Sequence, residues 1–292
     1  MARGLLIVNP FASAVNDAAV HEVARVLGDV EVRFTERSGH ATELAREASA
    51  GAFDAIYVFS GDGGFNEVLN GVDGRTPLGF IAGGGASVLP RALGLPRDQV
   101  EGARRLLAGR TRRISLGRAN GRRFGFAAGI GLDAEFVRRV DALGRTREGG
   151  RAGNLAFGWT AVRVLAEHRF QLEPVLEVRG HGRAGFALCA NCDPYTYAGP
   201  IPLHVAPLAR FELGIDIVAA RSLRPTALPR FLVYVLRGRG QERARDVLYV
   251  HDLDRAEIVC DRPLPLQLDG EDLGDVGEVL LEAERNAVTV LH

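Results

Sequence analysis

Two apolar runs in the first third of the chain end in glycine-rich turns that lead directly into helical segments. The first is DAIYVFSG followed by DGGFNEVLNG, and the second is PLGFIAGG followed by GASVLPRALGL. A hairpin turn cannot explain both junctions, because parallel strands are joined by longer crossovers that contain a helix. The pattern predicts a doubly wound parallel sheet, in which ligands collect beyond the carboxyl ends of the strands.

The same alternation reaches the amino terminus, where the strand patterns GLLIVNP and EVRFT flank the helical pattern VNDAAVHEVARVLG. HATELAREASAGA is a further helical pattern. From about Ile114 the chain changes to extended segments separated by Gly, Pro and Asp turns, which is typical of an antiparallel β-sandwich. We therefore expect an α/β domain at 1–115 and a β-rich domain at 116–292, and leave open whether the final residues return to the first domain.

Two helical patterns interrupt the β-rich part, NLAFGWTAVRVLAEH and TALPRFLVYVLRG. The arginine- and glycine-rich stretch LGRTREGGRAGN, at 143–154, predicts a mobile loop. TALPRFLVYVLRG is apolar on a helical set that includes Phe231, Leu232, Val235 and Leu236, and Arg230, Arg237 and further arginines flank it. That combination is typical of a helix at an anionic membrane surface, although a core-packed helix followed by a solvated basic loop explains it slightly better.

Composition excludes several classes of protein. The 292 residues include 36 basic and 36 acidic side chains, so no net field favours nucleic acid and we expect no nucleic-acid partner. Every basic side chain apart from histidine is arginine, which rules out a GxxxxGK[ST] phosphate loop. The chain has no apolar run of spanning length and no secretory signal, which predicts a cytoplasmic protein. Peripheral attachment to the inner membrane face stays open.

Cys189 and Cys192 form a CxxC pattern within the apolar run GFALCAN. No second Cys/His pair lies at zinc spacing, so we expect a buried strand rather than a metal or redox site.

The turn SGDGG has the residues that a phosphate site needs. A strand that ends in glycines and leads into a helix presents backbone N–H groups and the positive end of the helix to phosphate oxygens. Asp62 alone is equally well explained as an ordinary turn residue. The second glycine turn, at 83–85, favours a shared nucleotide site instead. VNPFAS closes the first strand at the same edge, where Ser13 is a candidate cap for the next helix.

Six motifs in this order resemble the diacylglycerol kinase catalytic-domain family of lipid kinases, which includes the sphingosine kinases. Its members carry turns of the type NPxSG, GGDGTxNE and PxGTxNxxAR, then GIGxDA, an AP…G…D segment and a late DGE. This chain has NPFAS, SGDGGFNE, AGGGASVLPRALG, GIGLDA, APLARFELGID and LDGE. The resemblance covers nearly the whole chain and implies transfer of a phosphate from ATP, with Mg²⁺, to a lipid hydroxyl, most simply that of diacylglycerol.

Carried over by position, the resemblance assigns the catalytic carboxylates to Asp62, Asp269 and Glu271, the last two as the groups that remove the proton of the lipid hydroxyl. It places the nucleotide at the following residues: Asn9, Pro10, Phe11, Ala12, Ser13, Thr35, Gly61, Asp62, Gly63, Gly64, Phe65, Asn66, Glu67, Gly85 and Ser87. For a structural Mg²⁺ it offers Glu212 and Asp216, but Asp216 is equally plausible as a strand residue, and we assign no metal ligand.

The chain also departs from the family pattern. Gly64 and Gly85 stand where the family has hydroxyl residues, Ser87 where it has Asn, and Ala82 where it has Pro. Each lost contact should cost about 0.5–1.5 kcal/mol of nucleotide binding. Three alternatives therefore stay open: a non-catalytic lipid- or nucleotide-binding protein of the same fold, a kinase for a sphingoid base or other lipid alcohol, and a soluble-substrate kinase related to the NAD kinases. Whether the chain forms a homodimer is also open.

Overall fold

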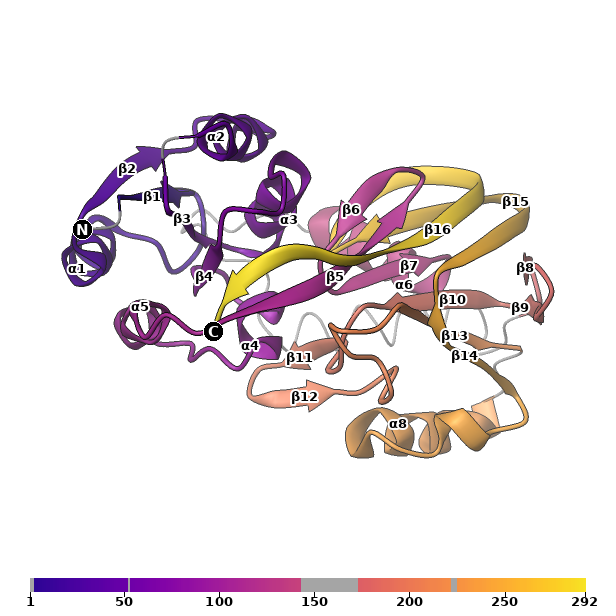
Figure 1. Cartoon of the computed structure of the whole chain (residues 1–292). Coiled ribbons are helices and arrows are strands. Elements are labelled where there is room, and N and C mark those ends of the chain that lie inside the picture. Colours follow the sequence, from indigo (N-terminus) through magenta and orange to yellow (C-terminus); the bar gives the residue numbers. More distant parts are fainter. Residues whose placement is uncertain (1–2, 52, 143–172, 222–224) are drawn as a thin grey trace. The chain divides into compact units, whose positions relative to one another are not determined.

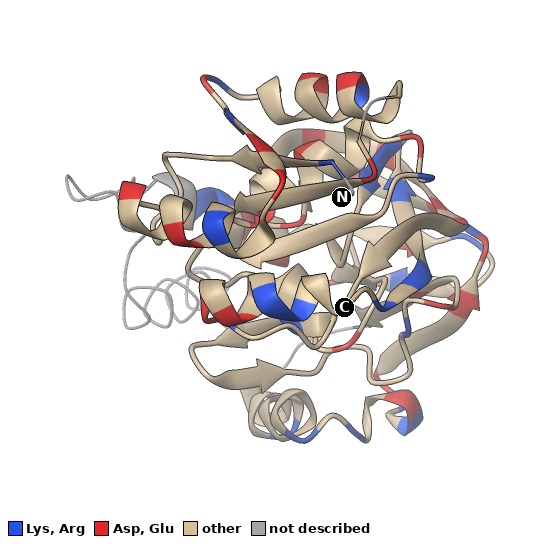
Figure 2. Ribbon diagram, turned by 60° about the vertical axis from the view of Figure 1, so that its left-hand side comes forward, with Lys and Arg blue, Asp and Glu red and all other residues tan. Residues whose placement is uncertain are grey.

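The computed structural model describes residues 3–51, 53–142, 173–221 and 225–292 (Figure 1). The chain forms two compact units, one of residues 1–115 with 285–292 and the other of residues 116–284. Two strands, β5 (Thr111–Ala119) and β16 (Glu271–Leu291), carry the chain from one unit to the other. Acidic and basic residues are interspersed along the described chain (Figure 2).

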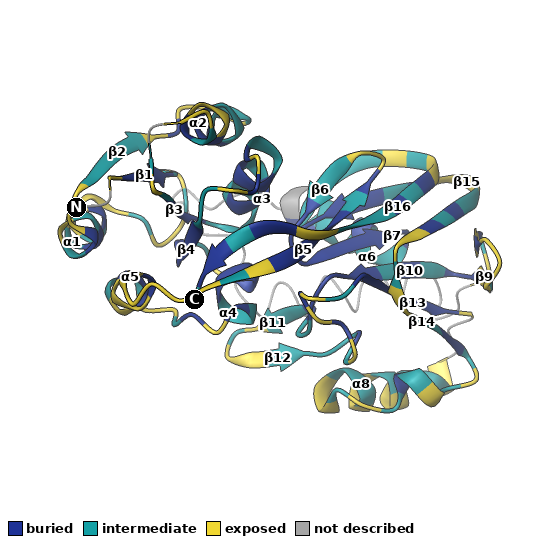
Figure 3. Ribbon diagram, in the orientation of Figure 1, coloured by how far each residue is buried: buried dark blue, intermediate teal, exposed yellow. Residues whose placement is uncertain are grey.

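The first unit contains a four-stranded parallel sheet in the order β4-β3-β1-β2. Its strands are β1 (Gly4–Val8), β2 (Val30–Phe34), β3 (Ala55–Ser60) and β4 (Leu78–Ala82). β1 and β4 are buried along their whole length (Figure 3), because helices cover both faces of the sheet and β4 lies between β3 and the end of β16. Val290, near the end of β16, pairs with Leu78 of β4.

Helices cover both faces of this sheet (Figure 1). α2 and α3 contact each other on one face, and α1 and α5 contact each other on the opposite face. The helices of this unit are α1 (Asp17–Leu27), α2 (His40–Ser49), α3 (Asp62–Gly71), α4 (Val88–Ala92) and α5 (Gln99–Leu107). The strand order reverses between β1 and β3, so the exits of these two strands form the topological switch point of the sheet.

The second unit is built on antiparallel strands in the order β14-β13-β10-β7-β15-β16. Besides β16 these are β7 (Ala127–Ile130), β10 (Phe186–Ala190), β13 (Ile215–Ala220), β14 (Val247–Leu253) and β15 (Arg255–Leu268). Shorter strands are β6 (Arg122–Phe124), β8 (Leu176–Val178), β9 (Gly182–Ala184), β11 (Thr196–Ala198) and β12 (Ile201–Leu203). Phe124, Ile130, Ile217 and Ile258 lie in its buried core.

Two α-helices of the described chain belong to this unit, α6 (Leu132–Ala142) and α8 (Leu228–Arg237), together with the 3₁₀ turns η1 (Pro225–Ala227) and η2 (Gln241–Arg243). α8 confirms the helical pattern predicted there. The pattern NLAFGWTAVRVLAEH and the loop expected at 143–154 lie outside the described residues.

The predicted fold class is confirmed: an α/β unit with a parallel sheet precedes a unit of antiparallel strands. GFALCAN forms the buried strand β10, and Cys189 and Cys192 are free buried thiols, as expected. Burial raises the pKa of the Cys189 thiol, which makes a reactive thiolate unfavourable. The prediction missed α5 and α6. Gly102 and the arginine-rich sequence obscure the periodicity of α5, and a single residue, Gly131, separates α6 from the strand that precedes it.

Candidate functional site

Three neighbouring parallel strands, β1, β3 and β4, end in the three turns that the sequence singled out. The turns share one edge of the sheet because β3 pairs in parallel with both β1 and β4. Gly61 and Gly84 explain why two of these turns are rich in glycine. A Cβ added to Gly84 would lie 2.9 Å from the Cα of Gly61, so the turns approach each other more closely than side chains would permit.

The turn after β1 is closed by Asn9. Its side-chain Oδ1 accepts a hydrogen bond from the backbone N–H of Phe11 at 3.0 Å, and its carbonyl accepts one from Ala12 at 3.2 Å. The Phe11 side chain is 59% exposed. The candidate cap at Ser13 is wrong: Asn16 caps α1, accepting from the N–H of Ala19 at 2.9 Å. The helix begins later than expected because residues 9–15 are used by this turn.

Asp62 connects the second turn to the third. It begins α3, and its Oδ1 accepts a hydrogen bond from the N–H of Val88 at 2.7 Å, at the start of α4. A carboxylate in this position satisfies an amide that the short helix leaves unpaired and interacts favourably with the positive helix end. Asp62 therefore holds the two glycine turns together.

Ser87 is buried, has a φ of 45°, and uses its hydroxyl within its own turn. The Oγ atom accepts from the N–H of Gly84 at 3.2 Å and donates to the Gly84 carbonyl at 2.9 Å. A Cβ added to Gly85, by contrast, would meet nothing within 4 Å. Of these two predicted nucleotide residues, Ser87 shapes the turn and Gly85 leaves open space beside it.

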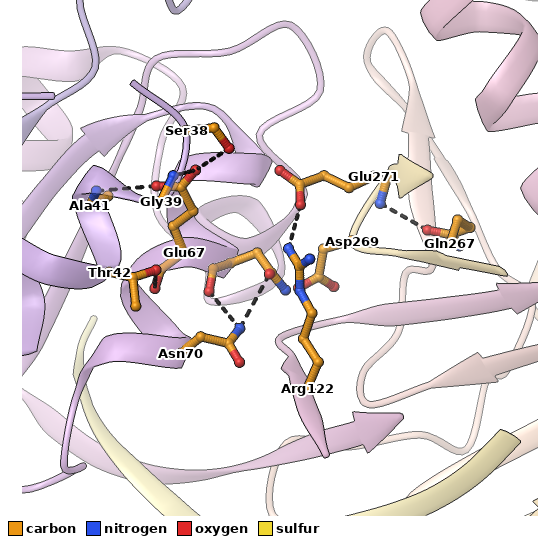
Figure 4. Close-up of polar contacts among 12 residues, drawn as sticks. Ser38, Gly39, Ala41, Thr42, Glu67, Asn70, Arg122, Gln267, Asp269 and Glu271 are labelled. Atoms are coloured by element: carbon orange, nitrogen blue, oxygen red, sulfur yellow. Dashed lines mark hydrogen bonds and ion pairs between the residues drawn. The ribbon is translucent and has the colours of Figure 1, made fainter. Parts of the chain in front are cut away.

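The side chain of Glu67 points from α3 to the first turn of α2 (Figure 4). Its two carboxylate oxygens accept hydrogen bonds from the N–H groups of Gly39, at 2.8 Å, and Ala41, at 3.1 Å. Glu67 thus caps α2 from a neighbouring helix. Phe65 and Asn66, unlike Glu67, are buried, at 1% and 0% exposure, so their side chains belong to the interior of this unit.

Thr35 follows β2, and its N–H donates to the carbonyl of Val8 at 2.8 Å. The threonine is buried beside the exit of β1. Thr35 thus lies at a strand exit, and its role in nucleotide binding stays a prediction.

In the second unit, the LDGE segment forms a tight turn between β15 and β16 in which Asp269 has a φ of 49°. The Asp269 carboxylate is 3% exposed and accepts hydrogen bonds from three consecutive backbone N–H groups. The donors are Gly125 at 2.6 Å, Phe126 at 3.0 Å and Ala127 at 3.0 Å. Its two oxygens are therefore engaged by the chain entering β7.

Glu271 is more accessible than Asp269. Its side chain is 33% exposed, and its Oε2 forms an ion pair with the guanidinium of Arg122 at 2.5 Å (Figure 4). The guanidinium keeps a positive charge beside this carboxylate. Sequence reasoning missed Arg122, because nothing in the pattern NGRRF distinguishes it from other surface arginines.

A hydrogen-bonded network supports the LDGE turn from behind. The Oε1 of Gln267 accepts from the N–H of Gly270 at 2.9 Å, while its Nε2 donates to the carboxyl of Asp133 at 2.8 Å. Tyr195 donates its hydroxyl to the same carboxyl oxygen at 2.9 Å. Burial raises the pKa of the Asp133 carboxyl, and these two hydrogen bonds lower it in part. The GIGLDA motif contains Asp133, and was the one sequence signal for this network.

The resemblance offered Asp216 as a candidate ligand of a structural Mg²⁺, and its carboxylate contacts three groups of the protein. One oxygen of Asp216 accepts from the hydroxyl of Tyr249 at 2.8 Å, and the other contacts His251 Nδ1 at 2.8 Å and the N–H of Asp252 at 3.0 Å. Both oxygens of this fully buried carboxylate are thus engaged by groups of the protein. Among the residues that the structure describes, no group of three or more His, Cys, Asp or Glu side chains could hold a metal.

Comparison with known proteins gives a consistent assignment. Residues 3–119 match the diacylglycerol kinase catalytic domain. A relative from Chromohalobacter salexigens, named "Probable lipid kinase YegS-like", is 30% identical over 262 residues, which are 87% of this chain and 81% of that protein. The chain belongs to the diacylglycerol kinase catalytic-domain family of lipid kinases, as its motifs predict. Other matches are partial: they span 53% and 57% of two further curated relatives, the second being the Bacillus subtilis diacylglycerol kinase.

Solved structures support the same fold. A diacylglycerol kinase from Bacillus anthracis aligns with 100% of this chain and 97% of its own, with a TM-score of 0.73 and 20% identity. An NAD kinase from Archaeoglobus fulgidus, solved in complex with ATP, aligns with 99% of this chain and 93% of its own, with a TM-score of 0.54 and 14% identity. At these identities the likeness concerns the fold alone.

Proposed function

We propose that this protein transfers the γ-phosphate of ATP, supplied as its Mg²⁺ complex, to the hydroxyl of a lipid, with diacylglycerol as the leading acceptor. The observation that carries the proposal is the convergence of three strand-exit turns at one edge of the parallel sheet, in a chain of this family. Backbone N–H groups at such an edge suit phosphate oxygens, and no lysine is required. A sphingoid base or another lipid alcohol is the alternative acceptor.

In this proposal the first unit binds the nucleotide. The glycine turns at 61–64 and 83–85 bring backbone close to the phosphates, and Asp62 fixes the geometry of both turns through its bond to Val88. In this proposal the Mg²⁺ of the reaction is the ion that arrives bound to the phosphates of ATP. The protein's own contribution is to position the nucleotide, which is the main requirement of phosphoryl transfer.

The second unit supplies the acceptor chemistry. We assign proton removal to Glu271, because its side chain is accessible, whereas both oxygens of Asp269 already accept backbone hydrogen bonds. A carboxylate beside the lipid hydroxyl orients it and accepts its proton as the oxygen attacks the γ-phosphate. Asp269 positions the turn that carries Glu271.

Access to a lipid is the remaining requirement, and α8 is suited to provide it. None of its residues is buried, and Leu232, Val233 and Leu236 are 59%, 42% and 46% exposed. Their spacing places them on one face of the helix, which the structure turns outward. Phe231 and Val235, which the sequence grouped with them, are half-buried. No helix among the described residues is long and apolar enough to cross a membrane.

We therefore expect α8 to attach the protein to an anionic membrane surface, with Arg230, Arg237 and Arg239 beside the apolar face. The variant Leu232→Ser/Leu236→Ser should bind vesicles of phosphatidylglycerol and phosphatidylcholine at least about 10-fold more weakly than the wild type, because two large apolar side chains no longer enter the interface. The control is Leu107→Ser, which removes a 48% exposed leucine from α5. Equal binding by the double variant and the wild type in vesicle sedimentation would contradict this attachment.

A second candidate function is a lipid- or nucleotide-binding protein without transferase activity. Gly85 favours it, since the open space beside its Cα is a place where a hydroxyl side chain could meet a ligand and none is present. The two functions are separated by assaying phosphate transfer from Mg-ATP to lipid alcohols in mixed micelles. Transfer to one lipid class supports the kinase, and lipid or ATP binding without transfer supports the binding protein.

A further inference from the structure

Gly64, which stands in the first turn of α3, has no room for a side chain because Ser60 fills the space. A Cβ built on Gly64 would lie 2.1 Å from the Oγ of Ser60 and 2.8 Å from its Cβ. Real Cβ atoms do not approach this closely, and rotation of the Ser60 side chain would move its Oγ but not its Cβ. The two positions are therefore coupled: a side chain fits at position 60 or at position 64, but not at both.

The hydroxyl of Ser60 is buried without a partner. The residue is the last of β3 and is 2% exposed. Among the described residues, no group forms a hydrogen bond with its Oγ. Buried hydroxyl groups are nearly always paired, so an unpaired one in a native fold calls for a ligand or another specific explanation. Alanine would fill most of the same volume without this cost, which argues against a role in packing alone.

The position of this hydroxyl indicates what would pair with it. It is directed at the first turn of the ten-residue helix α3, close to where the N–H groups of 61–64 begin the helix. The side-chain nitrogen of Asn9, from the turn after β1, lies 4.0 Å from the same Cβ position on Gly64. Donor groups from two strand exits thus surround the start of a helix, which favours an anion such as phosphate.

We propose that Ser60 is a nucleotide-binding residue whose hydroxyl donates to a phosphate oxygen of ATP and takes the place of a side chain at position 64. This inference rests on the proposed function and deepens it. The family pattern has a hydroxyl side chain where this chain has Gly64, and the Ser60 hydroxyl would then supply that contact from the same turn. The loss at Gly85 is not, because the space beside that glycine is open.

The proposal is tested by thermal unfolding with and without Mg-ATP, and by titration of Mg-ATP. For Ser60→Ala we expect a melting temperature without nucleotide at or above that of the wild type, because an unpaired hydroxyl is removed. The ATP-induced rise should be smaller, and ATP binding should be roughly 2- to 12-fold weaker, as for one lost hydrogen bond. A packing role would give the reverse, a lower melting temperature without nucleotide and unchanged ATP binding, and would overturn the proposal.

A matched set of glycine variants tests the steric coupling. Gly64→Ser should lower the melting temperature, whereas Gly85→Ser, in the neighbouring turn, should not. Ser60→Gly/Gly64→Ser moves the hydroxyl to the other position and should recover ATP binding relative to Ser60→Gly alone. If the folded double variant bound ATP no better than Ser60→Gly, the proposal that a hydroxyl at position 60 replaces one at position 64 would be overturned. If the wild type bound no ATP, the proposed function itself would fail, and this inference with it; unchanged affinity in Ser60→Ala would remove only the inference.

Discussion

Asp62 is the residue in which structural and chemical roles must be separated most carefully. Its carboxylate caps α4 and joins two glycine turns, so removing it changes the shape of the site as well as its charge. An alanine variant that lacks activity would therefore show little about the chemistry. Asparagine is the informative replacement, because its side-chain oxygen can still accept the hydrogen bond from Val88.

We predict that the free energy of unfolding of Asp62→Asn lies within about a few tenths of a kcal/mol of the wild-type value. For Asp62→Ala it should be about 1 kcal/mol lower, which is the usual contribution of a helix cap. Phosphate transfer should fall by about 100-fold or more in both variants, as when an electrostatic group is removed from an active site. Urea unfolding and a transfer assay measure the two effects. Wild-type turnover in Asp62→Asn would show that only the cap matters.

Among the elements, α2 depends on a group from outside its own sequence. Gly39 precedes it with a φ of 81° and no side chain, so its first N–H groups are capped by Glu67 of α3. The sequence resemblance assigns Glu67 to the nucleotide site. The contacts assign its carboxylate to this helix.

Glu67→Ala should therefore lower the free energy of unfolding by about 1–2 kcal/mol, because two amides lose their acceptor and the helix dipole loses its counter-charge. Glu67→Gln, which keeps one acceptor oxygen, should lose less. Both free energies can be obtained from urea denaturation, with Mg-ATP affinity measured alongside. A stable Glu67→Ala protein with sharply weaker ATP binding would favour the nucleotide role.

The network beneath the LDGE turn predicts a particular pH dependence. Burial raises the pKa of Asp133 in the folded protein above the value near 3.8 expected in the unfolded chain. The folded state then binds more protons between these two pKa values, so this residue's contribution to stability falls as the pH rises through that interval. Asp133→Asn cannot ionise and does not suffer this loss.

From about pH 4 upward, the unfolding free energy of Asp133→Asn should therefore increase relative to that of the wild type. The difference should stop changing above the pKa that Asp133 has in the folded protein. Tyr195→Phe removes a hydrogen bond that lowers the folded-state pKa of Asp133, and should extend the upper limit of this interval to higher pH. The check is urea unfolding at a series of pH values. A difference that does not change with pH would contradict the raised pKa.

The elements of the first unit were predictable where apolar runs end at glycine or helical periodicity is strong. The strands that became β1, β3 and β4 are of this kind. Only Ser13 was predicted as the cap of α1, and Asn16 caps the helix instead because the preceding turn uses residues 9–15. The partner of Asp62 lies 26 residues away, and the one that holds Asp269 more than 140 residues away. Contacts of this range depend on tertiary packing, which periodicity does not encode.

At the scale of the whole molecule, we propose that each of the two units contributes residues to the reaction. The first holds the nucleotide turns and Asp62, and the second holds Asp269, Glu271 and the outward apolar face of α8. Each unit should therefore contain residues whose replacement stops transfer without unfolding the protein. Glu271 is the most direct choice in the second unit, because glutamine keeps the side chain's shape and its hydrogen bond to Arg122.

The most direct test is the transfer of labelled γ-phosphate from Mg-ATP to a panel of lipid alcohols in mixed micelles, with Glu271→Gln and Asp62→Asn as folded comparison proteins. We predict label in diacylglycerol with the wild type, and a loss of about 100-fold or more in both variants, within the range for a general base or an electrostatic group. No label in any lipid, from folded wild-type protein that still binds lipid or ATP, would contradict the kinase and support a binding protein of the same fold.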